Sequence, residues 1–317
     1  MTAAHEVEYG AHLPLIGLGT SPSLPALAAY ARAASRLGYR YLCANDHLLF
    51  GRPWLDGPTA LAALIEASQD MTLVTTASLP VLRGPVPLAK TLAAIDLLSG
   101  GRLVAGVGPG SSADDYAAAG IGFQERWRRF DEAVQVLRAL LHGGDEFEGE
   151  FYSTRGVLLE PRPAQRPGPP IWVASWGSPV GLRRVAGLGD GWLASAYNTT
   201  PGRFADALDR LAEELRRAGR PPERFPSAIA TTWLHVTEDE ADAERTLGDV
   251  LAPMLHRPVE ALRSAPLLIG PAEVCAERLA AFVDAGARRI FVWPLGDELA
   301  QLELFRERVT CLLPRRP

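Results

Sequence analysis

The chain has 317 residues and a mass of 34.1 kDa, a length that suits one large α/β barrel or two ordinary domains. Hydrophobic residues make up 47% and charged residues 22% of the sequence, as in folded globular proteins, so an intrinsically disordered chain is excluded. The net charge is −5 and no basic stripe with interleaved aromatic residues occurs, which argues against a nucleic-acid partner.

Residues that form disulfides or bind metals are few and scattered. The three cysteines show no CxxC spacing and the six histidines show no HxxxH or HxH spacing, so we expect neither a disulfide framework nor a metal centre. No run of about 18 apolar residues occurs, and the N-terminal MTAAHEVEYG lacks the order of a signal peptide. We therefore expect a cytoplasmic protein with no membrane partner.

A short apolar run followed by an amphipathic helix and a glycine recurs along the chain, which predicts βα units around a parallel sheet. Strands are expected at 9–13, 39–44, 71–78, 102–108, 171–175, 192–196, 228–236 and 289–295. Helices are expected at 24–37, 57–69, 86–98, 126–141, 179–188, 202–217, 271–284 and 297–312. Eight strands close a parallel barrel, so the predicted fold class is an α/β (β/α)₈ TIM barrel, with an open doubly wound sheet as the alternative.

Two segments do not follow this repeating βα pattern. Residues 143–170 are rich in proline and are interpreted as an inserted hairpin followed by an extended connector. Residues 237–268 are acidic and then mixed, and they are expected to form extra helices before the last βα unit. We expect residues 1–317 to form one TIM-barrel domain that carries both insertions.

In such a barrel the active face lies at the carboxyl ends of the strands, so polar residues that follow strands are the candidates. Asp46 and His47 follow the second predicted strand. A histidine next to a carboxylate can serve as an oriented acid or base, because histidine changes charge near neutral pH. The alternative is a structural role, with the aspartate capping a loop.

Two further segments could bind an anion. The run GVGPGSS, with Gly108 and Gly110, resembles a phosphate loop, but it is not GxGxxG, and a tight turn explains it equally well. Ser175, Gly177 and Ser178 precede a predicted helix whose first turn contains a proline, which favours a phosphate there. A plain serine N-cap would account for Ser178 alone.

Taken together, these segments resemble the luciferase-like family of flavin-dependent monooxygenases and deazaflavin-dependent oxidoreductases. The segments that carry the resemblance are ASRLGYRYLCANDHL (34–48), TASLPVLRGPVPLAKTLAAIDLLSGGRLVAGVGPG (76–110), RWRRFDEAVQVLRALL (126–141), FEGEFY (147–152), PRPAQRPGPPIWVASWGSPVGLRRVAGLGDGWLAS (161–195) and FVDAGARRIFVWPL (282–295). Their order resembles the deazaflavin subgroup more than the flavin subgroup.

The resemblance implies that coenzyme F420, or alternatively FMN, binds at the carboxyl ends of the strands. His47 with Asp46 would face the ring, and His47 would handle a proton. The segment Thr76, Ala77 and Ser78 would support the back of the ring, with a cis bond between Ala77 and Ser78. The loop formed by Ser175, Trp176, Gly177 and Ser178 would hold the cofactor phosphate.

Two positions depart from the family pattern. Ser111 stands where some deazaflavin dehydrogenases have a glutamate that donates a proton, so sugar-phosphate dehydrogenation by their mechanism is not expected. Trp176 is bulky where small residues are common, and it would narrow the entrance to the site.

The resemblance predicts an oxidoreductase that transfers hydride or oxygen between reduced deazaflavin or FMN and a small organic substrate. A non-catalytic flavin-binding protein of the same fold is the alternative. An aldolase is disfavoured because the sole lysine, Lys90, lies within a predicted helix. The substrate has no readable motif, and a homodimer is left open.

Overall fold

In the computed structural model, which describes residues 7–17 and 22–314, eight parallel strands close into a barrel. They are β1 (Glu8–His12), β2 (Tyr41–Ala44), β3 (Thr72–Thr75), β4 (Leu103–Val107), β5 (Ile171–Ala174), β6 (Gly191–Ser195), β7 (Ser227–Val236) and β9 (Arg289–Pro294). Each strand pairs with its neighbour in this order, and the pairing of β1 with β9 completes the ring. The predicted TIM-barrel fold and its eight strands are confirmed.

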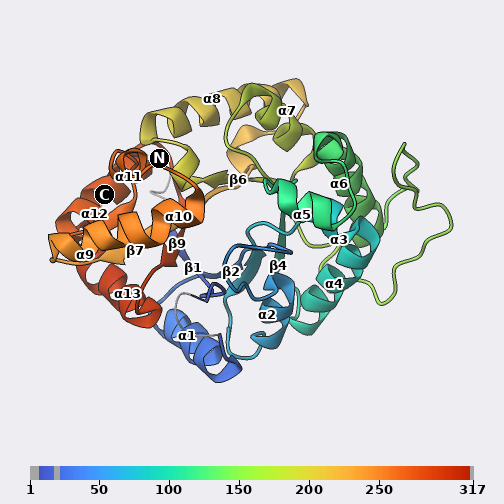
Figure 1. Ribbon diagram of the computed structural model, residues 1–317. Helices are drawn as coiled ribbons and strands as arrows, with labels where there is room; N and C mark the ends of the chain where they lie inside the picture. Colours follow the sequence, from blue (N-terminus) through green and yellow to red (C-terminus); the bar gives the residue numbers. More distant parts are fainter. Residues whose placement is uncertain (1–6, 18–21, 315–317) are drawn as a thin grey trace.

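The helices are arranged mainly around the outside of the ring of strands, as Figure 1 shows. They are α1 (Leu24–Arg36), α2 (Gly57–Ala63), α3 (Pro80–Arg83), α4 (Pro85–Leu98), α5 (Ala113–Ala118), α6 (Arg126–His142), α7 (Pro179–Leu188), α8 (Pro201–Arg217), α9 (Glu240–Arg245), α10 (Ala252–Leu255), α11 (Val259–Arg263), α12 (Ala272–Asp284) and α13 (Glu298–Leu304). Among the described residues, no helix is long and apolar enough to cross a membrane.

Two apolar layers hold the barrel together, because successive residues of a strand point to opposite faces. On β2, Leu42 and Ala44 pack outward against the helices, whereas Tyr41 and Cys43 point into the barrel. The interior cluster consists of Tyr41, Cys43, Val74, Val104, Trp172, Leu193, Ala228, Ala230 and Phe291. The barrel is therefore filled with side chains below the level of its carboxyl-terminal mouth.

The two insertions differ in their structure. Residues 143–170 contain only an isolated antiparallel bridge between Glu148 and Ser153, consistent with the predicted hairpin, and lead as a long connector to β5. This segment forms the light-green loop at the right of Figure 1. Residues 237–268 form α9, a π-helical turn over Thr246–Leu251, α10 and α11, so the expected extra helices are confirmed.

Three elements differ from the prediction. A ninth strand, β8 (Leu268–Gly270), pairs with the last residues of β7, beyond the point where β6 has ended. The helix expected over 57–69 ends at Ala63, and the chain continues in turns up to Gln69, whose φ is 49°. The closing helix changes after Leu304 into a π-helical turn, Phe305–Val309, followed by a short 3₁₀ turn.

Candidate active site

The carboxyl ends of β2, β3 and β4 are held side by side by main-chain hydrogen bonds that extend the sheet. The amide of Thr76 donates to Ala44 O at 2.7 Å, and the amide of Ser78 donates to Gly106 O at 2.9 Å. The amide of Gly108 in turn donates to Ser78 O at 3.0 Å. Three segments that the sequence singled out therefore meet at one edge of the barrel mouth.

His47 is oriented by a carboxylate, but that carboxylate belongs to Asp115. His47 Nδ1 lies 3.0 Å from Asp115 Oδ2, and Asp115 Oδ1 accepts a hydrogen bond from the amide of Leu49 at 2.7 Å. The Asp115 residue is only 1% exposed. Because both carboxylate oxygens are used and the group is buried, Asp115 holds the imidazole and its loop in one arrangement.

Asp46 is not the partner of His47, so the interpretation of the two as one acid–base pair is wrong. Its carboxylate makes a two-pronged ion pair with Arg83, whose Nε and Nη2 donate at 2.6 and 2.5 Å, and it also accepts from the amide of Leu79. Successive residues of an extended segment point in opposite directions, which separates the two side chains. Asp46 fixes the start of α3 against the end of β2.

Arg83 joins Asp46 to Asp56, the residue that caps α2. Burial opposes the charge of Arg83, but its hydrogen bonds to both carboxylates outweigh this and raise its pKa. Burial would raise the pKa of Asp56, yet hydrogen bonds from Thr59 and Arg83 lower it instead. Arg83 and Asp56 therefore stay charged, and the ion pairs of Arg83 with Asp46 and Asp56 connect the loops that follow β2 and β3.

Aromatic side chains form a wall beside His47. Trp54 contacts the imidazole edge-on, with ring centroids 4.7 Å apart, and it meets Trp293 at 5.9 Å. Trp293 is stacked between His12 and Trp233, at centroid distances of 4.3 and 4.5 Å. Burial lowers the pKa of His12 to about 3, so His12 is neutral and behaves as part of this wall.

The predicted ring-binding segment Thr76, Ala77 and Ser78 lies at the mouth of the barrel. The cis bond joins Thr76 to Ala77, so the expected cis bond between Ala77 and Ser78 is misplaced by one residue. A Cβ atom built on Gly108 would lie 3.4 Å from the Cβ of Ala174 and 3.5 Å from that of Ala77. Small residues at the ends of three strands thus form a flat floor.

This part of the barrel also contains buried polar atoms that have no hydrogen-bond partner among the described residues. They are Ser78 Oγ after β3, Trp233 Nε1 on β7, and Trp54 Nε1 in the aromatic wall. A buried donor or acceptor without a partner costs about 1–3 kcal/mol, so a set of them favours a bound polar molecule. A flat floor with unsatisfied polar groups around it fits a planar, heteroatom-rich cofactor.

The loop from Ser175 to Ser178 has the geometry of an anion site only in part. Ser178 caps α7 by accepting from the amide of Gly181, and Ser175 Oγ accepts from the amide of Gly177 at 3.2 Å. Gly177 has a φ of 89°, a conformation that favours glycine. Both hydroxyl groups can still donate to an anion at the start of α7, while Trp176, 61% exposed, projects at the rim.

The glycines at and after the end of β4 mainly allow neighbouring backbone segments to approach each other closely. A Cβ on Gly106 would lie 1.9 Å from Thr75 O, so only glycine permits this approach of β3 and β4. Gly110 has a φ of 78° and turns the chain over Tyr116, whose hydroxyl donates to Pro109 O. At Gly110 the geometry therefore favours a tight turn, whereas Gly108 belongs to the floor.

A polar network, whose contacts were not predicted from the sequence, lies on the opposite side of the mouth. Ser195 and Thr231 hydroxyls lie 2.9 Å apart, and Asn198 donates to Ser195 at 3.0 Å. Arg257, from the loop after α10, donates to Asn198 Oδ1 at 2.5 Å. A bulge in β7 turns Thr231, with a φ of 55°, toward this network.

Asp115 was also missed, although the sequence contains a signal for it. Ser112 and Asp115 have the spacing of a helix start, and Ser112 Oγ accepts from the amide of Asp115 at 3.1 Å. The exposed Ser111 carries no carboxylate, as the sequence indicated, but the buried acid lies one helical turn later. Within residues 7–17 and 22–314, no group of three or more His, Cys, Asp or Glu side chains is placed to hold a metal ion.

Comparison with known proteins agrees with this architecture. The chain is 30% identical over 313 residues to an F420-dependent hydroxymycolic acid dehydrogenase of Mycobacterium tuberculosis, covering 89% of this chain and 83% of the relative. It is 27% identical over 311 residues to an F420-dependent glucose-6-phosphate dehydrogenase of Rhodococcus erythropolis, covering 88% of this chain and 90% of that relative.

Solved structures share the fold along almost the whole chain. An F420-dependent secondary alcohol dehydrogenase superposes with a TM-score of 0.82 at 19% identity, covering 98% of this chain and all of that one. A monooxygenase from Streptomyces bottropensis superposes with a TM-score of 0.79 at 24% identity, covering 96% of this chain and 99% of that one. The model of the luciferase-like monooxygenase family matches residues 9–289. The chain therefore belongs to the luciferase-like monooxygenase family.

Proposed function

We propose that this chain is an oxidoreductase that uses the deazaflavin F420 to move a hydride to or from a small organic substrate, with His47 transferring the accompanying proton. The observation that carries the proposal is the buried Asp115, which fixes the His47 imidazole at the end of β2 beside the floor of small residues. Oriented imidazoles of this kind serve as general acids and bases.

We infer different roles for the two nitrogen atoms of His47 from their hydrogen bonds. Nδ1 faces a carboxylate that can only accept when ionised, so Nδ1 carries a proton and Nε2 is left to exchange one. Asp115 itself is held by the amide of Leu49, so it is a positioning residue. When bound, the deazaflavin would supply the hydride donor or acceptor, while His47 Nε2 would give or take the proton at the substrate oxygen.

The other residues of the site would bind and orient. Ala77, Gly108 and Ala174 would lie under the ring, since their small side chains leave a flat surface. The hydroxyl groups of Ser175 and Ser178 would hold the cofactor phosphate at the start of α7. The aromatic wall would exclude water from the reacting atoms, which strengthens each hydrogen bond in the site.

The curated relatives favour F420, since the names of the dehydrogenases from Mycobacterium tuberculosis and Rhodococcus erythropolis both specify this cofactor. An FMN-dependent oxygenase is the second candidate. It is favoured by the fold of a Baeyer–Villiger monooxygenase from Pseudomonas putida in complex with FMN, which superposes with a TM-score of 0.74 at 16% identity. The two candidates differ in whether oxygen is consumed.

The test is to titrate the purified chain separately with F420 and with FMN, following cofactor fluorescence, and then to measure turnover with a panel of alcohols and aldehydes. His47→Asn should lower turnover by about 10²- to 10⁴-fold while cofactor affinity stays within about threefold, because it removes proton transfer. His256→Asn, at an exposed histidine of α10's C-cap, is the matched control and should change neither. Binding of neither cofactor would refute the proposal, and tight binding of FMN alone with oxygen uptake would favour the second candidate.

A further inference from the structure

A cavity lies at the end of the barrel opposite to His47. Its volume is about 1190 Å³, and it opens where β1, β7 and β9 begin. Glu8 lines it from β1, Ser227 from β7 and Arg289 from β9, while α12 and the π-helical turn after α13 close one side. This cavity is separate from the candidate active site, because a barrel filled with side chains lies between the two.

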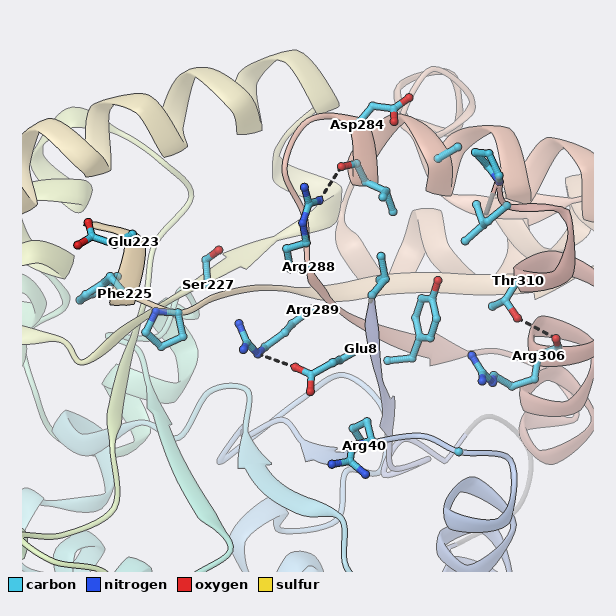
Figure 2. Close-up of a pocket in the computed structure, with 18 of the residues that line it drawn as sticks. Glu8, Arg40, Glu223, Phe225, Ser227, Asp284, Arg288, Arg289, Arg306 and Thr310 are labelled. Atoms are coloured by element: carbon cyan, nitrogen blue, oxygen red, sulfur yellow. Dashed lines mark hydrogen bonds and ion pairs between the residues drawn. The ribbon is translucent and has the colours of Figure 1, made fainter. Parts of the chain in front are cut away.

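Arginine dominates the charged lining of this cavity. Among the described lining residues, five guanidinium groups face three carboxylates, in a chain whose net charge is −5. Figure 2 labels four of these arginines and all three carboxylates around the cavity. The charged lining residues are Arg40, Arg224, Arg288, Arg289, Arg306, Glu8, Glu223 and Asp284.

Three of the arginines are held in place by contacts that use only some of their donors. Arg289 Nε lies 2.9 Å from both Glu8 Oε2 and the Tyr41 hydroxyl. Arg288 Nη1 donates to two carbonyls, one in the last turn of α12 and one in the loop after it, and Arg306 Nε donates to Leu37 O at 3.0 Å. Each guanidinium has five N–H donors in a planar fork, so each keeps donors for a further partner.

The remaining two arginines are exposed, and neither side chain has a partner among the described residues. Arg40 precedes β2, and Arg224 ends the short 3₁₀ turn before β7. Fixed guanidinium groups lie beside free ones, and the carboxylates of the described lining are too few to neutralise them. Such a site attracts an anion that carries several charges. Arginine is the residue best suited to hold phosphate, because its fork matches two phosphate oxygens at once.

We propose that this cavity is a second binding site, which takes a small anion with two or more phosphate groups, and that Arg40 and Arg224 contribute their free guanidinium groups to it. A multiply charged anion fits better than a single phosphate, because the arginines come from four separate parts of the chain: the loop before β2, the turn before β7, the start of β9 and the segment after α13.

The test is calorimetric titration of the full-length chain with inorganic triphosphate at about 150 mM NaCl, where weak surface attraction is screened. We expect a dissociation constant of about 0.1 mM or tighter, and at least tenfold weaker binding for the double variant R40Q/R224Q. The matched control is R203Q/R210Q, which removes two exposed arginines of α8 that do not line the cavity, and it should bind like the wild type. F420 or FMN affinity should be the same in both double variants.

Two further measurements distinguish phosphate binding in this cavity from carboxylate binding and from binding at the loop before α7. Citrate at equal concentration tests carboxylates, and tighter binding of citrate than of triphosphate would overturn the assignment to phosphate. The variant S175A should leave triphosphate binding unchanged, and loss of binding there would move the anion to the loop at α7. Absence of binding by the wild type, or equal weakening in both double variants, would overturn the proposal.

Discussion

Replacing Asp115 by Asn should disable His47 while leaving the fold in place. The carboxylate oxygens of Asp115 accept from the Leu49 amide at 2.7 Å and face His47 Nδ1 at 3.0 Å. An asparagine has a single acceptor oxygen, which the Leu49 amide would take. Its NH₂ group would then point at Nδ1, so the imidazole would have to move its proton to Nε2.

The size of the effect follows from this switch. A hydrogen bond to a buried charged group contributes about 1.5–3 kcal/mol, which corresponds to roughly a 10- to 150-fold change in rate. Because Nε2 would no longer be free to accept, we expect kcat of D115N to fall by at least this factor. KM for the cofactor should change little, since Asp115 is buried behind the imidazole.

Two measurements separate this role from a merely structural one. Long-range ¹H–¹⁵N correlation spectra of the imidazole should show the Nδ1–H tautomer in the wild type and the Nε2–H tautomer in D115N. D114N, at the exposed neighbouring position of α5, is the matched control and should resemble the wild type in both spectrum and turnover. The reasoning is refuted if D115N keeps the wild-type tautomer and turnover, or if D114N loses as much.

Three further outcomes are expected. Arg83→Met should lower the free energy of unfolding, measured by urea denaturation, by about 3 kcal/mol or more, because it leaves the Asp46 carboxylate buried without its partner. A loss below about 1 kcal/mol would contradict this prediction. As the pH falls from 6.5 toward 3, His12 takes up a proton in the unfolded chain before it does so in the folded chain. The free energy of unfolding of the wild type should therefore fall by up to about 1.4 kcal/mol per pH unit more than that of H12Q. If the free energies of the two proteins change in parallel with pH, the lowered pKa of His12 is contradicted. Iodoacetamide should modify Cys311 alone in the native protein, which mass spectrometry can check. The other two cysteines are buried, and burial raises the pKa of Cys275 to about 12 and raises the pKa of Cys43 as well. Rapid labelling of either buried cysteine would contradict this prediction.

The barrel could be predicted from the sequence because each of its strands is an apolar run followed by a strongly periodic helix. The strand β8 was missed because three residues, Leu268–Gly270, are too short for any periodicity to appear. The predicted helix over 57–69 was too long, because apolar residues continue after Ala63 while the backbone turns. In both cases tertiary contacts, and not local pattern, decide the structure.

The site could be predicted only to the level of the segments that form it. The strand ends around His47, Ser78 and Gly108 do meet, as their places after strands indicated. The pairing within the site was wrong, because adjacency in the chain suggested Asp46, whereas the actual partner of His47 lies 68 residues away on α5. Which carboxylate reaches a histidine depends on how loops from different strands fold over one another.

The position of β8 makes residues 237–270 a segment that can be replaced without disturbing the barrel. β7 pairs with β6 and β9 to close the ring, and residues 237–270 make none of the hydrogen bonds between these strands. This segment leaves the end of β7 and returns as β8, which pairs with β7 beyond the end of β6. A segment attached in this way can be lengthened, shortened or exchanged without reopening the ring. The segment between Val236 and Pro271 can therefore be replaced by the corresponding segment of another family member on an unchanged scaffold.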